Sequence, residues 1–517
     1  MRLIETQILY KMMDTKFLLF TLLFVHGLCS AGTLYEKEDP KPNIIVFLVD
    51  DLGWQDISVF PNFKKLARSG VQFSDAYATP LCTPTRVSLL TGTNAARHRV
   101  TNWTHPDRDR STDHPDTIFR AVDWNINGLG TDKSENKTFL ATPLPRLLKE
   151  NGYKTILAGK AHFGSKGIAA ADPKNIGFDV NIAGSEIGHP ASYFGLENFD
   201  RLRNGSPDRN AVLGLEQFHG QDIFLTEALT QSALAALGDV EKQTQPFFLY
   251  LSHYAVHTPI MADPRYVDSF YGTSVDSVEA AYQSLVKGVD KSLGDVLDYL
   301  EENNLSENTV IFFLSDNGGL SRVPPRGGAS DTHNTPLRSG KGSVYEGGIR
   351  IPFVVKWPKV VQPEAVSKNP IIVEDLFSTI CAIAGVDDKE VVQTVDGINL
   401  LPYLQDADLI DSTRALVWHH PNRWIKEDFS VSSWASAMRI GNWKLIYDYT
   451  KQTLTLYNLD NDIGEKHNLA HTHPEKTMEL AELLTQKLKE RQAQLPRLKR
   501  TERFIPWPNE IEIDNTK

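Results

Sequence analysis

The chain has 517 residues, 41% of them apolar and 23% charged, so it is too apolar for a disordered tail and long enough for two or three domains, or for one large α/β domain with an appendage. Its 54 basic and 65 acidic side chains give a net charge of −11 at pH 7, which argues against a nucleic-acid backbone as the main partner. The three cysteines exclude a disulfide framework and a four-cysteine zinc site.

The first predicted element is a secretory signal peptide over residues 1–31. Lys16 precedes an apolar run from Phe17 to Cys29, and small residues follow it. The run is shorter than the ~20 residues of a membrane-spanning helix, so the pattern favours export over an uncleaved anchor. A lipid anchor at Cys29 is a weaker alternative, because Leu28 stands where a small residue is expected. We therefore expect a periplasmic protein, with secretion or attachment at the cell surface as alternatives, and no transmembrane segment in the mature chain.

The next segments alternate between strand and helix patterns. Residues 43–49 (NIIVFLV) form a continuous apolar run, which is typical of a central strand in a parallel sheet. Similar runs recur at residues 155–158, 247–251, 309–314 and 353–355. Between them, apolar residues at helical spacing predict a helix over residues 280–303. This alternation predicts an α/β sandwich with a mostly parallel sheet.

Polar side chains follow two of the predicted strands. Asp50 and Asp51 come directly after the first strand, and Asp316 and Asn317 follow the strand over 309–314. Such residues line the ligand crevice of a parallel sheet. Adjacent buried aspartates repel each other unless a cation is present. A set of ligands made only of oxygen atoms suits Ca²⁺ or Mg²⁺ better than zinc. The competing interpretation is that both pairs only cap a helix or begin a turn.

After about residue 410 the pattern changes. A hairpin, a further strand and a closing amphipathic helix are predicted at residues 437–447, 453–457 and 475–494. We therefore predict three parts: the signal peptide over 1–31, a large α/β domain over 32–410, and a smaller α+β domain with an antiparallel sheet over 411–517.

Cys82 lies in the segment LCTPTRVSLLTG, in which an extended turn around Pro84 passes into a helix. A cysteine just before a helix amino terminus and near Arg86 lies in positive potential, although a lone cysteine is more often a small buried apolar residue. The pattern Cys-x-Pro-x-Arg followed by Leu-Thr-Gly92 resembles the signature of type I sulfatases. In that family a separate enzyme oxidises the cysteine to Cα-formylglycine (3-oxoalanine).

The resemblance extends over nearly the whole mature chain and includes exported bacterial polysaccharide or carbohydrate sulfatases. It implies an alkaline-phosphatase-like sandwich as the fold of the large domain. Three further segments resemble landmarks of the family: residues 152–164 with Lys160 and His162, residues 252–259 with His257, and residues 334–352 with Lys341. Arg350, in the last of these segments, is expected to be structural or to support the carboxylates.

The resemblance implies a sulfuric ester hydrolase that acts on a sulfated carbohydrate, such as oligosaccharides from an extracellular polysaccharide. A gem-diol made from formylglycine is the implied nucleophile, and it forms a covalent sulfo-enzyme intermediate. The implied catalytic residues are Cys82, Arg86, Lys160, His162, His257 and Lys341, and the implied Ca²⁺ ligands are Asp50, Asp51, Asp316 and Asn317. His162 is the candidate base, and His257 or Lys341 is the candidate acid. The implied partner is a formylglycine-generating enzyme or an anaerobic sulfatase-maturating enzyme.

Two segments supply candidates for substrate binding. Residues 416–424 are similar to a segment that helps form a sugar subsite in carbohydrate sulfatases, and the polar segment 102–137 is long enough to be functional. The candidates are His105, Arg108, Arg110, His189, His420, Asn422 and Arg423. The alternative for each is an ordinary surface residue.

Two other functions compete with this interpretation. The first is a phosphonate or phosphodiester hydrolase of the same superfamily, but the paired Lys160 and Lys341 favour a monoanionic sulfate. The second is a non-catalytic protein that binds sulfated glycans, against which the presence of Cys82, Arg86 and all four predicted metal ligands argues.

Overall fold

The computed structural model describes residues 40–58, 60–202, 205–241, 245–320, 333–386, 390–425 and 434–513. Residues Pro42–Lys517 form one compact unit. The predicted signal peptide lies outside the described residues, and the predicted boundary after residue 410 stays a prediction. Among the described helices, none is both long enough and apolar enough to cross a bilayer.

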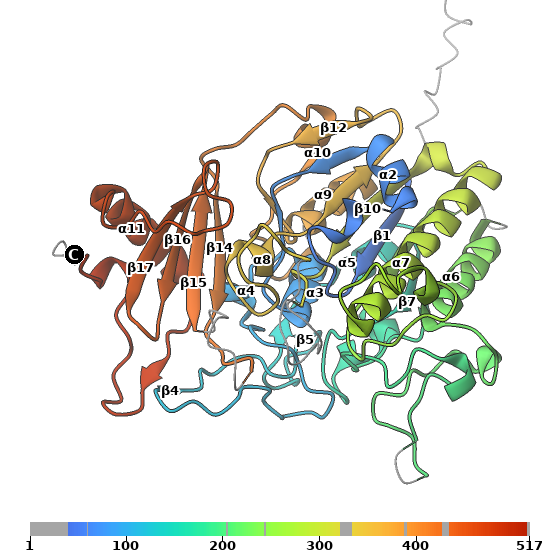
Figure 1. The fold of residues 1–517 in the computed structure, drawn as a ribbon, viewed down its shortest axis with the longest axis horizontal. Helices are drawn as coiled ribbons and strands as arrows, with labels where there is room; N and C mark the ends of the chain where they lie inside the picture. Colours follow the sequence, from blue (N-terminus) through green and yellow to red (C-terminus); the bar gives the residue numbers. More distant parts are fainter. Residues whose placement is uncertain are drawn as a thin grey trace, which may run out of the picture. The chain divides into compact units, whose positions relative to one another are not determined.

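An eight-stranded sheet forms the centre of this unit (Figure 1). Its strand order is β12-β2-β11-β10-β1-β9-β7-β8. The strands are β1 (Asn43–Val49), β2 (Val71–Phe73), β7 (Lys154–Gly159), β8 (Val180–Ile182), β9 (Phe247–Ser252), β10 (Thr309–Ser315), β11 (Phe353–Lys356) and β12 (Ala365–Ser367). All five predicted strands are present, and the mostly parallel sheet is confirmed. However, β11 runs antiparallel to both of its neighbours, β10 and β2.

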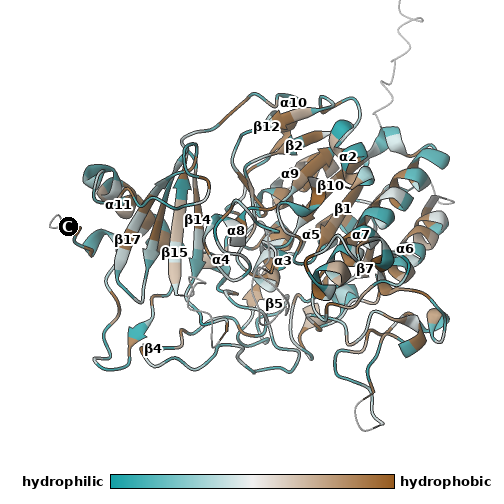
Figure 2. Ribbon diagram, in the orientation of Figure 1, coloured by the Kyte–Doolittle hydropathy of each residue, from teal (hydrophilic) through white to brown (hydrophobic). Residues whose placement is uncertain are grey.

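Helices cover both faces of the sheet because the side chains of β1 alternate between two apolar cores. Ile44, Val46 and Leu48 belong to the core that contains α3 (Cys82–Thr91), α5 (Leu144–Glu150) and α9 (Asp375–Ala384). Ile45, Phe47 and Val49 belong to the core that contains α2 (Pro61–Arg68), α6 (Leu225–Glu241) and α7 (Ser277–Glu302). Figure 2 shows the central strands in apolar colours and these last three helices with mixed polar and apolar residues. The predicted helix over 280–303 corresponds to α7, whose apolar stripe is buried.

A second, antiparallel sheet follows in the carboxyl-terminal part. Its strands are β14 (Ala415–His420), β15 (Ala435–Ile440), β16 (Trp443–Asp448) and β17 (Thr453–Asn458), paired in chain order. Helix α11 (Pro474–Glu490) packs on this sheet through Leu480, Leu484 and Leu488. The predicted hairpin, strand and helix are therefore confirmed, whereas β14 was not predicted as a strand.

Short elements complete the fold. The short helices are α4 (Ala95–His98), α8 (Glu346–Ile349) and α10 (Leu401–Gln405), and the short strands are β3 (Ala76–Tyr77), β4 (Phe119–Arg120), β5 (Leu129–Gly130), β6 (Phe139–Leu140), β13 (Ile371–Ile372) and β18 (Arg497–Leu498).

Buried charges join the second sheet to the segment around α8. Lys444 of β16 is fully buried, and its Nζ lies 2.8 Å from Glu346 Oε1 and 2.8 Å from Glu465 Oε1. Arg350 also pairs with Glu346, at 2.7 Å, and with Asp75, at 2.6 Å. Arg350 therefore makes structural ion pairs, and Glu346 links it to Lys444 of the second sheet.

Replacing Lys444 with methionine is expected to lower the free energy of unfolding by about 3–5 kcal/mol, because it leaves the buried Glu465 without its cation and removes one of the two cations that pair with Glu346. Burial already raises the pKa of Glu465 to about 7, although Lys444 lowers it. Urea unfolding measures the change. As a control, Lys65→Met removes an ion pair in which both side chains are more than half exposed, and it should cost less than about 1 kcal/mol. Equal losses in the two variants would contradict this prediction.

Candidate active site

The four predicted metal ligands meet at the carboxyl ends of β1 and β10. The two strands are parallel neighbours, with Val49 paired to Ser315, so the residues that follow them are adjacent in space. The Asn317 amide donates a hydrogen bond of 2.8 Å to Asp51 Oδ1, and the backbone N–H of Asp51 donates one of 3.2 Å to Asp316 Oδ1. Asp50, Asp51, Asp316 and Asn317 are all buried. The structure therefore brings together the whole predicted ligand set.

Three buried cations surround these carboxylates. Each belongs to a different segment: Arg86 lies on α3, Lys160 follows β7, and Lys341 precedes α8. The pairs are Lys160 Nζ with Asp50 Oδ2 at 2.6 Å, Lys341 Nζ with Asp51 Oδ1 at 2.6 Å, and Arg86 Nη2 with Asp316 Oδ2 at 2.7 Å. The three cations among the predicted catalytic residues thus lie within one site.

Three of the predicted metal ligands each keep a side-chain oxygen that makes no hydrogen bond to these cations. Asp50 Oδ1, Asp51 Oδ2 and Asn317 Oδ1 are buried and have no hydrogen-bond partner among the described residues. Burial and the neighbouring Asp316 raise the pKa of Asp50 to about 8, against the lowering effect of Lys160. Ligand atoms of Asp50, Asp51 and His257 lie within 4.8 Å of one another. Unpartnered oxygens on crowded carboxylates fit a hard divalent cation.

Cys82 is the first residue of α3, whereas the sequence pattern predicts a position just before the helix. It is unpaired, only 3% exposed, and surrounded by the same cations. Burial raises the pKa of its thiol, although Lys160 and Lys341 lower it. The side chain at this position therefore lies in the positive potential of a helix amino terminus, but the thiol itself is a weak nucleophile because it stays protonated.

The two predicted catalytic histidines contact different groups of the site. His162 Nε2 donates a hydrogen bond of 2.9 Å to the carbonyl of Thr104, which leaves Nδ1 as the acceptor, 3.6 Å from Cys82 Sγ. His257 Nε2 lies 3.7 Å from Asp51 Oδ2. Burial lowers the pKa of both imidazoles, and Lys160 and Lys341 add to this effect. His162 is thus placed to take a proton from the side chain at position 82.

Comparison with known proteins identifies the family. The sulfatase family model matches residues 42–386. The chain belongs to the sulfatase family. Its enzymes are sulfuric ester hydrolases, so the resemblance to type I sulfatases is confirmed. A second family model, described as N-sulphoglucosamine sulphohydrolase, C-terminal, matches residues 340–494 of this sulfatase.

The relatives match most of this sulfatase. It is 29% identical to a sulfatase of Formosa agariphila, over 92% of this chain and 93% of the relative. It is 31% identical to human N-acetylgalactosamine-6-sulfatase, over 84% of this chain and 82% of the relative. The crystal structure of Ps i-CgsB in complex with k-i-k-neocarrahexaose superimposes with a TM-score of 0.67 and 27% identity, over 87% of this chain and 92% of that chain. The predicted alkaline-phosphatase-like fold with a carboxyl-terminal antiparallel sheet is thereby confirmed.

The predicted substrate-binding residues of this sulfatase separate into three groups. His189 adjoins the site, with its ring stacked 5.9 Å from that of His257. His105 is buried next to Thr104, whereas Arg108 and Arg110 are exposed and lie near carboxylates of their own loop. The remaining three hold the segment 101–116: His420 lies 3.3 Å from the Thr101 carbonyl, Asn422 donates to Asp113, and Arg423 donates to the Pro115 carbonyl. Substrate binding by all seven residues stays a prediction.

Three residues of the site were not predicted. Ser252 Oγ accepts a hydrogen bond of 2.7 Å from Arg86, and Thr83 Oγ1 lies 3.3 Å from His162 Nδ1. Trp424 lies beside Lys341, whose Nζ is 5.9 Å from the centre of the indole ring. Gly342 permits this approach, since a Cβ on that residue would lie 2.1 Å from the indole. The sequence signals were the end of a predicted strand for Ser252, the cysteine motif for Thr83 and the similarity over 416–424 for Trp424.

Proposed function

We propose that this sulfatase hydrolyses sulfate monoesters on a sulfated carbohydrate, such as oligosaccharides from an extracellular polysaccharide, with formylglycine at position 82 and Ca²⁺ at the strand ends. The observation that carries the proposal is the position of Cys82, at a helix amino terminus among Lys160, Lys341 and the strand-end carboxylates. A carbohydrate substrate is supported by the relatives, which include an N-acetylgalactosamine-6-sulfatase and a protein bound to neocarrahexaose.

The residues of the chain have separate tasks in this reaction. Formylglycine supplies an oxygen nucleophile in the form of its hydrate, and Ca²⁺ supplies Lewis-acid stabilisation of a sulfate oxygen. Lys160 and Lys341 neutralise the charge that spreads over the sulfate oxygens. Arg86 holds Asp316 and the Lys160 carbonyl, at 2.7 and 2.9 Å. It therefore orients one metal ligand and the backbone that carries Lys160.

The reaction also requires two proton transfers, one from the nucleophile at position 82 and one to the leaving oxygen of the sugar. His162 Nδ1 faces position 82 and is our proposed base. His257 and Lys341 both lie beside Asp51. Either of them is our proposed acid for the leaving oxygen of the sugar.

We also propose that the protein is exported, most simply to the periplasm, with removal of residues 1–31. The predicted signal peptide supports export. A formylglycine-generating or anaerobic maturating enzyme is then required before or during export. The mass of the peptide that contains Cys82 tests this requirement directly.

Addition of Ca²⁺ to chelator-treated protein is expected to raise the thermal unfolding temperature and to restore sulfate release. The physical reason is that a cation bound only by the folded chain stabilises it, by about 2.7 kcal/mol at one hundred times its dissociation constant. Thermal unfolding with Ca²⁺, Mg²⁺ or neither distinguishes the two ions. Asp51→Asn is the control, because it removes a ligand and should abolish the shift. A wild-type protein whose unfolding temperature does not respond to either ion would contradict the metal assignment.

Turnover of matched aryl esters tests the proposed reaction. The matured enzyme should cleave an aryl sulfate faster than the corresponding aryl phosphate and phosphate diester, and it should release sulfate from at least one sulfated polysaccharide or its oligosaccharides. Faster cleavage of phosphate would favour the phosphonate or phosphodiester hydrolase instead. Binding of sulfated glycans without any sulfate release by formylglycine-containing protein would favour the non-catalytic alternative.

A further inference from the structure

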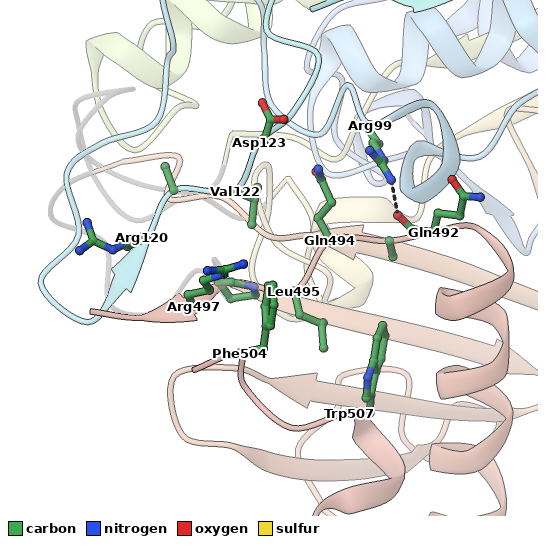
Figure 3. Close-up of a pocket in the computed structure, with 13 residues that line it drawn as sticks. Arg99, Arg120, Val122, Asp123, Gln492, Gln494, Leu495, Arg497, Phe504 and Trp507 are labelled. Atoms are coloured by element: carbon green, nitrogen blue, oxygen red, sulfur yellow. Dashed lines mark hydrogen bonds between the residues drawn. The ribbon is translucent and has the colours of Figure 1, made fainter. Parts of the chain in front are cut away.

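A second pocket, outside the proposed active site and with a volume of about 600 Å³, is lined by two parts of the chain that are far apart in the sequence (Figure 3). One part contributes Arg99 and residues 120–123, and the other contributes residues 492–497, Phe504 and Trp507. None of the proposed catalytic, metal-binding or substrate-binding residues is needed to form its basic and aromatic walls. Strands β4 and β18 lie at its edge and pair with each other. The arginines and aromatic residues that line this pocket therefore have no role in the proposed active site.

Two arginines face each other across these strands. Arg120 is directly opposite Arg497 in the antiparallel register, and like charges in directly opposite positions destabilise a strand pair. Glu502 neutralises Arg120, with 2.7 Å between Arg120 Nε and Glu502 Oε2. Among the described residues, Arg497 has no direct ion pair, although the charge of Glu502 also acts on it at longer range. One carboxylate thus serves two guanidiniums, and an anionic ligand would stabilise the charge that remains on Arg497.

An aromatic ring holds this guanidinium in place. Arg497 lies over the ring of Phe504, 4.3 Å from its centre, and the two residues also form a β-bridge. Phe504 is 57% exposed, so its ring is accessible to a ligand. Figure 3 shows Trp507 on the same side of the pocket. A guanidinium group beside an exposed aromatic ring can bind an anionic group of a ligand while the ring packs against an apolar surface of the same ligand.

The charge of the pocket is opposite to that of the whole chain. Arg99 also lines it and donates a hydrogen bond of 3.0 Å to the Gln492 carbonyl, and among the described residues it has no ion pair. Asp123 is the one carboxylate among the described lining residues. The adjoining segment 497–503 (RLKRTER) adds further basic residues to an otherwise acidic protein. Local positive charge on a protein of net charge −11 favours an anionic ligand.

We propose that this pocket is a second binding site for the sulfated carbohydrate and takes an anionic sugar unit remote from the sulfate ester that is cleaved. Arg497 and Arg99 bind sulfate or carboxylate groups of that unit, and Phe504 packs against its ring. The inference rests on the proposed carbohydrate substrate. A polymer is required, because one sugar unit has to occupy the pocket while another enters the active site.

Binding of dextran sulfate to the full-length chain, with uncharged dextran as the reference, tests the proposal. The double variant Arg99→Gln/Arg497→Gln should raise the Kd for dextran sulfate about tenfold or more. The matched variant Lys64→Gln/Arg68→Gln removes the same charge from exposed positions on α2 and should change the Kd less than twofold. Phe504→Ala leaves the charge unchanged and should weaken binding at least about threefold, without a loss of folding because the ring is exposed.

Three results would overturn the inference. These are absence of dextran sulfate binding by the wild-type chain, equal weakening in both double variants, and polyglutamate binding as tight as that of dextran sulfate, which would indicate an acidic protein segment as the partner. Turnover of a small aryl sulfate should be unchanged in Arg99→Gln/Arg497→Gln. If the wild-type enzyme released no sulfate from glycans but these binding differences remained, the proposed function would fail and the pocket assignment would stand.

Discussion

Replacement of Cys82 with alanine should abolish sulfate release, with a fall in kcat/KM of about 10⁴-fold or more, which is the order of loss seen when a catalytic nucleophile is removed. The residue is 3% exposed at the start of α3 and lies 3.6 Å from His162 Nδ1. Lys160, Lys341 and Arg86 would remain in place, but no side chain at position 82 could then attack sulfur. Aryl sulfate turnover by purified protein measures the effect.

The control for this variant is Cys381→Ala. Cys381 is the other described cysteine; it is partly buried on α9 and lies outside the site. Its replacement should leave turnover and the mass of the Cys82 peptide unchanged. Cys82→Ala itself should unfold at nearly the wild-type temperature, because alanine fills most of the same volume. More than about 1% of wild-type turnover in Cys82→Ala would refute the proposed nucleophile.

Replacement of Arg86 with lysine should have the second largest effect and should reduce both stability and turnover. The guanidinium is fully buried and donates to Asp316, to the Lys160 carbonyl and to Ser252 Oγ. A lysine keeps the charge but cannot span these partners. We expect a loss of about 3 kcal/mol in the free energy of unfolding and a fall of about 100-fold or more in kcat/KM of the folded enzyme.

Arg414→Lys is a matched control for Arg86→Lys. Arg414 also makes two contacts with one carboxylate, that of Asp375, at 2.8 and 2.5 Å, but away from the strand ends. This variant should lose stability and retain the kcat/KM of the folded fraction. Urea unfolding and initial rates, both measured on folded protein, separate the two effects. Wild-type kcat/KM in folded Arg86→Lys would show that Arg86 has no role in the reaction.

The strands of the central sheet could be predicted because continuous apolar runs report burial on both faces. The direction of β11 could not be predicted, since a buried strand has the same apolar pattern whether it runs parallel or antiparallel.

The contacts of the segment 416–424 could not be predicted either. Its similarity to a sugar-subsite segment singled out His420, Asn422 and Arg423, but the sequence contains no information on what packs against β14. In the structure these three side chains contact the backbone or side chains of residues 101–116.

The four predicted metal ligands lie together for a local reason. Asp50, Asp51, Asp316 and Asn317 each follow a strand directly, so the parallel pairing of β1 with β10 is sufficient to bring them together. The second pocket had no such signal. Arg120 and Arg497 are opposite each other only because β4 pairs with β18, and strands of two residues are too short to be recognised by any apolar period.

By itself the sequence determined the kinds of chemistry available to this sulfatase: a cysteine in a sulfatase signature, carboxylates at strand ends, and the lysines and histidines of the family landmarks. Only the tertiary structure decided which groups meet. Lys160 pairs with Asp50, Lys341 with Asp51 and Arg86 with Asp316, and each pair joins segments that are far apart along the chain. The reason is that strand pairing and helix packing set the distances between side chains, and burial in that packing then sets their pKa values.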